Sequence, residues 1–366
     1  MTWDHERAYL GLEAVSAAHE RETGTAIAWD RRSLQAFADE PIARLAEAYD
    51  LIILDHPHVG QIAETGSLVP LDPLPPEASL GGSAESYEWD GAVWAYPVDA
   101  ACQVAVRRPD LCPRPPATWD EAVGRGDLRP LTPLLPVDAF DMMMTLVAGM
   151  GEEEMAADPR RFVSEANGVR ALAILRALYR RGPGEAVRLN PIGALEALAT
   201  TDEFDCSPCL FGYVNYARPG FRAHALDYVD LPVFEGRPPR GILGGAGIGV
   251  SARGRHVEAA RAFAARVASA PVQSGSYLDA GGQPAHPAAW EARGGEAEYR
   301  GFLHGALPTM RGAWTRPRDP WFLGMVDEVC AIMTGFFERN EDEATFLGRI
   351  DAIYQHHRGA DRGSQS

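Results

Sequence analysis

The stretch Tyr49-Asp-Leu-Ile-Ile-Leu-Asp55 carries the strongest evidence on the fold. Its centre, residues 51–54, is apolar throughout and is bounded by Asp50 and Asp55. Short runs of this kind suit strands that are buried on both faces of a parallel sheet. We therefore expect an α/β protein whose mostly parallel sheets are flanked by helices.

Helical and extended segments alternate on both sides of this strand. Helices are predicted where apolar residues recur at i, i+3 and i+4, and strands where short apolar runs lie between turn residues. The predicted helices cover residues 7–22, 41–48, 172–179, 257–268, 322–336 and 346–354, and the predicted extended segments cover 25–29, 91–97, 101–107 and 248–251. Strands that alternate with helices support the α/β assignment.

The chain has 366 residues, which fits two lobes of ordinary domain size better than one core. A proline-rich stretch after residue 107 marks the expected first crossing between lobes. We expect residues 1–107 with 245–305 to form the first lobe and 108–244 with 306–356 to form the second. The polar residues 357–366 are expected to be disordered.

Composition excludes several functions. A net charge of −17 argues against nucleic acid and anionic membranes, because both require basic patches. No apolar run approaches the ~20 residues that span a bilayer. All 34 basic residues are arginine, so a lysine Schiff base and a P-loop lysine are impossible. We expect no cofactor.

Two further features bear on compartment and redox chemistry. The pair Cys206 and Cys209 has the spacing of a redox or metal motif but no second ligand pair, so we expect buried thiols. Met1 is followed at once by polar residues, without the pattern of a signal peptide. As given, the chain is expected to be cytoplasmic, and a trimmed or misannotated start would allow a periplasmic or extracellular location.

Four segments, in their order along the chain, resemble the family 1 extracellular solute-binding proteins of ABC transporters. The first segment, Tyr49-Asp-Leu-Ile-Ile-Leu-Asp55, resembles the family's strand that is followed by a ligand-facing loop. The other three segments are Gly91-Ala-Val-Trp-Ala-Tyr-Pro-Val-Asp-Ala100, Pro116-Ala-Thr-Trp-Asp-Glu-Ala122 and Gly244-Gly-Ala-Gly-Ile-Gly-Val-Ser251. The resemblance covers most of the chain and implies a type II periplasmic-binding-protein-like fold that closes by hinge bending. It also implies delivery of a small-molecule ligand to a permease, and we expect a monomer.

Candidate ligand-binding residues follow from the rule that ligands lie beyond the carboxyl ends of strands in open α/β sheets. In the first lobe this rule selects Trp3, Asp4 and His5 after the first short strand, and Asp55, His56 and His58 after the apolar strand. The resemblance places Tyr96 and Asp99 at the floor of the cleft. Asp4 as a helix cap, solvated histidines and Asp99 as a hinge residue are the structural alternatives.

The second lobe and the return crossing supply the remaining candidates. Tyr213 and Asn215 follow a possible strand, and Gly244 and Gly245 would let a ligand approach the backbone. The full set for this half of the chain is Asp138, Tyr213, Asn215, Gly244, Gly245 and Trp314. Trp314 is placed as a lid or side wall, with ordinary burial an equal alternative.

These residues favour binding of a small polar organic solute over catalysis. Aromatic residues near predicted strand ends indicate a carbohydrate-like ligand. Two alternatives stay open on the same fold, an enzyme that uses His5, Asp55, His56 and His58 and a sensor that passes closure to a partner. The same cluster is a weak candidate for a metal site, because two histidines across a proline lack ligand spacing.

Overall fold

The structure, a computed structural model, describes residues 1–33 and 40–364. Helices and strands alternate along the first half, as the sequence predicts. The strands are β1 (Thr2–Trp3), β2 (Arg31–Arg32), β3 (Leu51–Leu54), β4 (Glu88–Trp89), β5 (Ala92–Val93), β6 (Tyr96–Arg107), β7 (Cys206–Phe211), β8 (Asp227–Val229) and β9 (Leu243–Val250). The longer helices are α1 (Glu6–Thr23), α3 (Ile42–Ala48), α4 (Val59–Thr65), α5 (Trp119–Gly124), α6 (Pro136–Gly149), α7 (Glu165–Arg181), α8 (Pro191–Thr200), α9 (Val257–Ala268), α11 (Pro287–Arg293), α13 (Pro320–Glu338) and α14 (Glu343–Ser364). Short helical segments are η1 (His56–His58), η2 (Pro76–Ala78), η3 (Glu85–Tyr87), η4 (Gly184–Arg188), η5 (Val214–Ala217), α10 (Ala270–Val272), η6 (Gln273–Tyr277), η7 (Arg300–His304) and α12 (Leu307–Arg311).

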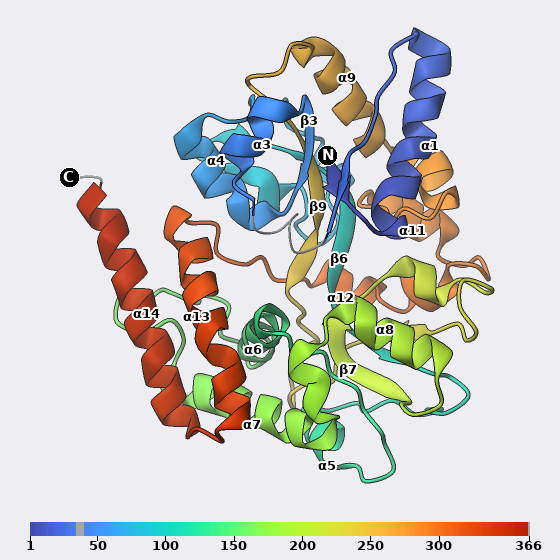
Figure 1. Ribbon diagram of the computed structural model, residues 1–366. Coiled ribbons are helices and arrows are strands. Elements are labelled where there is room, and N and C mark those ends of the chain that lie inside the picture. Colours follow the sequence, from blue (N-terminus) through green and yellow to red (C-terminus); the bar gives the residue numbers. More distant parts are fainter. Residues whose placement is uncertain (34–39, 365–366) are drawn as a thin grey trace.

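Two long strands, β6 and β9, form the spine of the molecule (Figure 1). They pair antiparallel from Tyr96 opposite Ile248 to Cys102 opposite Leu243. The apolar strand β3 pairs with the far edge of β9, and β7 and β8 pair with β6. One five-stranded sheet therefore passes through both halves of the molecule.

The strand directions correct one expectation. We expected mostly parallel sheets, but all the named strand pairs of the five-stranded sheet are antiparallel. The physical reason is that the chain passes between the halves first along β6 and then returns along β9, so the two longest strands run in opposite directions. Among named strands of the described residues, parallel pairing is confined to β1 with β2.

Helices cover the two halves of this sheet (Figure 1). One apolar cluster joins α6, α7, α13 and α14 through residues such as Phe140, Leu175, Met333 and Phe346. Two others pack α1, α3, α4 and α9 around β3 and β9. A further cluster packs Trp290 and Phe302 against Leu198 and Tyr228. The lobe boundaries at 1–107 with 245–305 and 108–244 with 306–356 therefore stay a proposal.

Two segments differ from expectation, and one helix needs comment. Helix α14 continues to Ser364, where a disordered tail from residue 357 was expected. The segment 25–29, predicted as extended, is not a strand. The strand lies later in the chain, at β2, which pairs with β1. Among the described residues, α13 alone is long and apolar enough to cross a membrane. Its buried Met325, Val329 and Phe336 belong to the core that it shares with α6 and α14.

Candidate functional site

A cavity of about 530 Å³ lies where the crossing strands meet the two halves of the molecule. Its walls come from β1, α1, η1, β6, α6, α8, β7, β9, α13 and the segment that precedes α13. The residues that line it are Trp3, Arg7, Asp55, Pro57, His58, Ala101, Leu135, Pro136, Val137, Asp138, Asp141, Asn190, Pro191, Phe211, Tyr213, Gly244, Gly245, Ala246, Arg316, Phe322, Leu323, Val326, Asp327 and Cys330. A volume of this size suits a small organic ligand.

Backbone and small side chains form the floor of the cavity. Ala101 of β6 faces Gly244, Gly245 and Ala246 of β9, so the two crossing strands lie directly beneath any ligand. Gly245 has φ +103° and a Cβ there would lie 2.2 Å from the carbonyl oxygen of Asp99. Only glycine fits this position without moving the neighbouring strand.

The first-lobe wall begins at the end of β3. Asp55 caps the turn of η1, where its carboxylate accepts from the His56 backbone N–H at 2.8 Å and from Arg316 Nη2 at 2.7 Å. Burial acts to raise the pKa of Asp55, but the Arg316 guanidinium and His56 outweigh it and hold the pKa well below its usual range. Asp55 is therefore a permanent negative charge.

The three histidines near this wall are all neutral at physiological pH. Burial lowers the pKa of both His5 and His56 to about 4 and also lowers the pKa of His58. His5 caps α1, since its Nδ1 accepts from the Arg7 N–H at 3.0 Å, and His56 Nδ1 lies 3.1 Å from Asp55. Only His58 lines the cavity.

A buried ion pair supports the floor from below. Arg7 Nε donates to Asp99 Oδ2 at 2.7 Å, a second bond joins Nη2 to Oδ1, and Nη1 donates to the carbonyl of Gly212 at 3.0 Å. The guanidinium also lies 4.3 Å from the centre of the Tyr213 ring. Arg7 thus ties α1 to β6 and to the loop after β7.

The second-lobe wall carries two more carboxylates. Asp138 and Asp141 lie in the first two turns of α6, three residues apart and therefore on neighbouring positions of one face. Asp141 lies 3.7 Å from Arg316, and burial raises its pKa to about 6. Burial and the charge of Asp141 raise the pKa of Asp138 well above its usual range.

Aromatic and aliphatic side chains complete the enclosure. Phe211 and Tyr213 follow one another at the end of β7, and Phe322, Leu323 and Val326 project from the first turns of α13. The Tyr213 ring is buried, and burial raises its pKa to about 12, so the phenol remains a neutral donor. The cavity thus combines ring faces with a few fixed polar groups, as ligand sites commonly do.

The structure brings half of the predicted site residues to this cavity. The residues that line it are Trp3, Asp55, His58, Asp138, Tyr213, Gly244 and Gly245. Asp99 and His56 lie behind the wall and hold Arg7 and Asp55 in place. Asp4 is exposed, and Tyr96 is buried in the first-lobe core. Asn215 donates to the Gly281 carbonyl at 3.2 Å, so its amide serves a loop contact.

Four charged residues of the cavity, Arg7, Asp141, Arg316 and Asp327, were not among the predicted site residues. Arg7 and Arg316 pair with carboxylates that lie 92 and 261 residues away in sequence. Such pairings depend on tertiary structure and leave no local pattern. Asp141 lies one turn after Asp138 on α6, so its spacing from a predicted site residue was a local signal.

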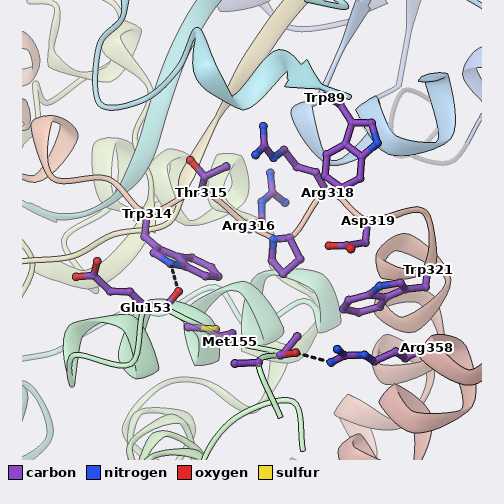
Figure 2. Close-up of a pocket in the computed structure, with 13 residues that line it drawn as sticks. Trp89, Glu153, Met155, Trp314, Thr315, Arg316, Arg318, Asp319, Trp321 and Arg358 are labelled. Carbon is purple, nitrogen blue, oxygen red and sulfur yellow. Dashed lines mark hydrogen bonds between the residues drawn. The ribbon is translucent and has the colours of Figure 1, made fainter. Parts of the chain in front are cut away.

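Trp314 lines a different hollow, of about 520 Å³ (Figure 2). Its indole N–H donates to the carbonyl of Glu153 at 2.8 Å. Trp89, Trp321 and Arg318 border the same hollow, and Arg316 borders both hollows. The segment from Trp314 to Asp319 therefore separates the two hollows and forms a partition. The side chain of Trp314 points into the second hollow, away from the ligand cavity.

No metal centre assembles in the described part of the chain. In that part, no three His, Cys, Asp or Glu side chains lie together so that they could hold an ion. His5 and His56 both use their Nδ1 atoms in the contacts given above, and His5 packs edge-on at 4.9 Å against Tyr213. The predicted cluster of His5, Asp55, His56 and His58 therefore does not form one site, because its members have separate structural roles.

Comparisons with known proteins identify the family and the fold of this chain. The family model described as bacterial extracellular solute-binding protein matches residues 25–293, well over half of the chain. The solved structure of MalE3 from T. maritima with bound maltose aligns with a TM-score of 0.79. That alignment covers 94% of this chain and 95% of the other at 16% sequence identity, which shows a shared fold. The predicted resemblance is confirmed, and the chain belongs to the bacterial extracellular solute-binding proteins, a family of binding proteins rather than enzymes.

Proposed function

We propose that this protein binds one small polar organic solute in the cavity between its lobes and delivers it to an ABC-type permease. The observation that carries the proposal is the cavity itself, which both lobes and both crossing strands line. Closure of the lobes would bury most of a small ligand against rings and a few polar groups. The family assignment supplies the transport context.

A carbohydrate-like ligand is favoured within this proposal. Sugars present apolar faces that stack on aromatic rings and hydroxyl groups that bond to carboxylates. The cavity offers Trp3, Phe211, Tyr213 and Phe322 for the first purpose and its aspartates for the second. MalE3, which has the same fold, was solved with maltose bound.

The location of the protein belongs to the same proposal. The family is described as extracellular. We propose that the protein works where its family does, outside the cytoplasmic membrane. Cell fractionation of the C-terminally tagged product of the complete gene tests this, and recovery in the cytoplasm alone would favour the sensor alternative instead.

The binding function is tested on freshly purified protein. Native mass spectrometry should reveal a non-covalent adduct of small mass that disappears on denaturation. In a thermal-shift screen against sugars, polyols, organic acids and amines, a ligand should then raise the melting temperature, and the rise should grow with the logarithm of its concentration above Kd. Chemical conversion of any ligand by the protein, followed by NMR, would contradict the proposal.

A further inference from the structure

Asp138 is an unusual carboxylate in the cavity. Its side chain is 7% exposed and lines the cavity, yet no hydrogen bond or ion pair joins it to any other described residue. A buried carboxylate without a partner costs free energy, so most such groups in folded proteins are paired. The carboxyl group of Asp138 can therefore accept hydrogen bonds from a group in the cavity.

The cationic side chains in the cavity are already engaged. Arg7 forms two bonds to Asp99, and Arg316 bridges Asp55 and Asp141. Four carboxyl groups, those of Asp55, Asp99, Asp138 and Asp141, surround these two guanidinium groups. Two carboxyl groups are therefore in excess, and the three histidines nearby add no charge because burial lowers the pKa of each.

We propose that the solute is a cation whose protonated amine is bound by Asp138 and Asp141 on the second-lobe wall. An ammonium group has three N–H donors and no acceptor, so it can bond to both carboxylates of this helical pair at once. The rest of the ligand then faces Phe211 and Phe322, whose rings also attract cations. This inference rests on the proposed function and narrows its ligand class.

A neutral polyol is the competing ligand. Its hydroxyl groups would also bond to the aspartates, but they would leave the repulsion between Asp138 and Asp141 in place. Burial already raises the pKa of both carboxyl groups, as expected for a site that lacks its positive charge. A bound amine removes both the repulsion and the unpaired acceptor, which is why the charge excess favours it.

The test compares amines with their hydroxyl twins by isothermal titration calorimetry at pH 7.5. The probes are glucosamine with glucose and 1,4-diaminobutane with 1,4-butanediol. In whichever of these two pairs the protein binds, we expect the amine to bind at least tenfold more tightly than its hydroxyl counterpart. Asp138→Asn and Asp141→Asn should each weaken amine binding at least tenfold and change binding of the neutral twin less than twofold. Exposed Asp120→Asn on α5 is the matched control and should change neither.

The outcomes separate the two levels of the proposal. A neutral twin that binds as tightly as its amine, or an Asp138→Asn protein that keeps full amine affinity, overturns the cationic ligand and leaves the binding function intact. If wild-type protein binds neither member of either pair and carries no adduct by native mass spectrometry, both proposals fail. Circular dichroism establishes that each variant is folded, and the two separate asparagine variants guard against local misfolding of one.

Discussion

The buried pair of Arg7 and Asp99 is the strongest single contact at the residue scale. Arg7→Met should lower the free energy of unfolding by about 3–5 kcal/mol, because Asp99 would keep its burial and lose its partner. Urea denaturation measures the change. Arg31→Met, which breaks an exposed pair with Glu13, is the control and should cost far less. A loss of that same small size for Arg7→Met would contradict the assignment.

Asp141 gives the stability of the protein a specific pH dependence. Burial raises its pKa from 3.8 to about 6, against the attraction of Arg316, with the charges of Asp55 and Asp138 also facing it. The folded state then holds the proton more tightly than the unfolded state, so the contribution of Asp141 falls as the pH rises from about 4 to 6. Asp141→Asn should therefore match wild type below pH 4 and gain up to about 3 kcal/mol above pH 6. Chemical denaturation across this range checks it, and an offset that does not change with pH would refute it.

Residues differ in how far sequence alone could place them. Asp55, Asp138 and Tyr213 were predicted to contact ligand, and all three line the cavity because each lies at an element end that faces the crossing strands. Trp314 was placed at the same cleft and lies behind the partition instead. Whether a side chain next to a crossing faces one hollow or the other depends on the twist of the backbone, which local sequence does not specify.

The crossing strands control the geometry of the site at the scale of elements. The β6–β9 ladder shifts register between Pro97 and Asp99, and Gly245 lies beside this irregularity with a positive φ. Gly245→Ala should lower the free energy of unfolding by about 2 kcal/mol or more, through backbone strain and a clash with the Asp99 carbonyl. The control is Gly348→Ala in α14, where a Cβ meets open space and helix propensity should add up to about 1 kcal/mol. Equal melting temperatures for the two variants would contradict this account.

Most helices could be predicted at this scale, and strand directions could not. The apolar spacing of α1, α9 and α13 locates each of them to within a few residues. The apolar run of β3 correctly indicated a fully buried strand. The same run is compatible with parallel or antiparallel neighbours, because burial on both faces is all that its composition reports. Pairing with β9 arises from a segment about 200 residues later.

At the scale of the whole molecule, Arg316 links the two sides of the cleft. It lies in the segment before α13 and contacts Asp55 after β3 and Asp141 on α6, so one guanidinium holds carboxylates of both walls together. Arg316→Gln would leave Asp55, Asp138 and Asp141 facing one another without that charge. We expect the unliganded variant to favour a more open cleft, because like charges separated by protein repel strongly.

Small-angle X-ray scattering tests this opening. A compact chain of 366 residues has a radius of gyration of about 21 Å, and Arg316→Gln should exceed wild type measured alongside it. Ligand affinity should fall about tenfold or more, because only the closed fraction binds fully. Arg318→Gln provides the same change in charge two residues later, on a side chain that donates to the carbonyls of Glu85 and Glu88. Arg318→Gln should keep the wild-type radius and affinity. If both variants opened the cleft equally, the effect would come from the overall charge of the segment, whereas opening in Arg316→Gln alone would identify its bridge as the contact that holds the lobes together.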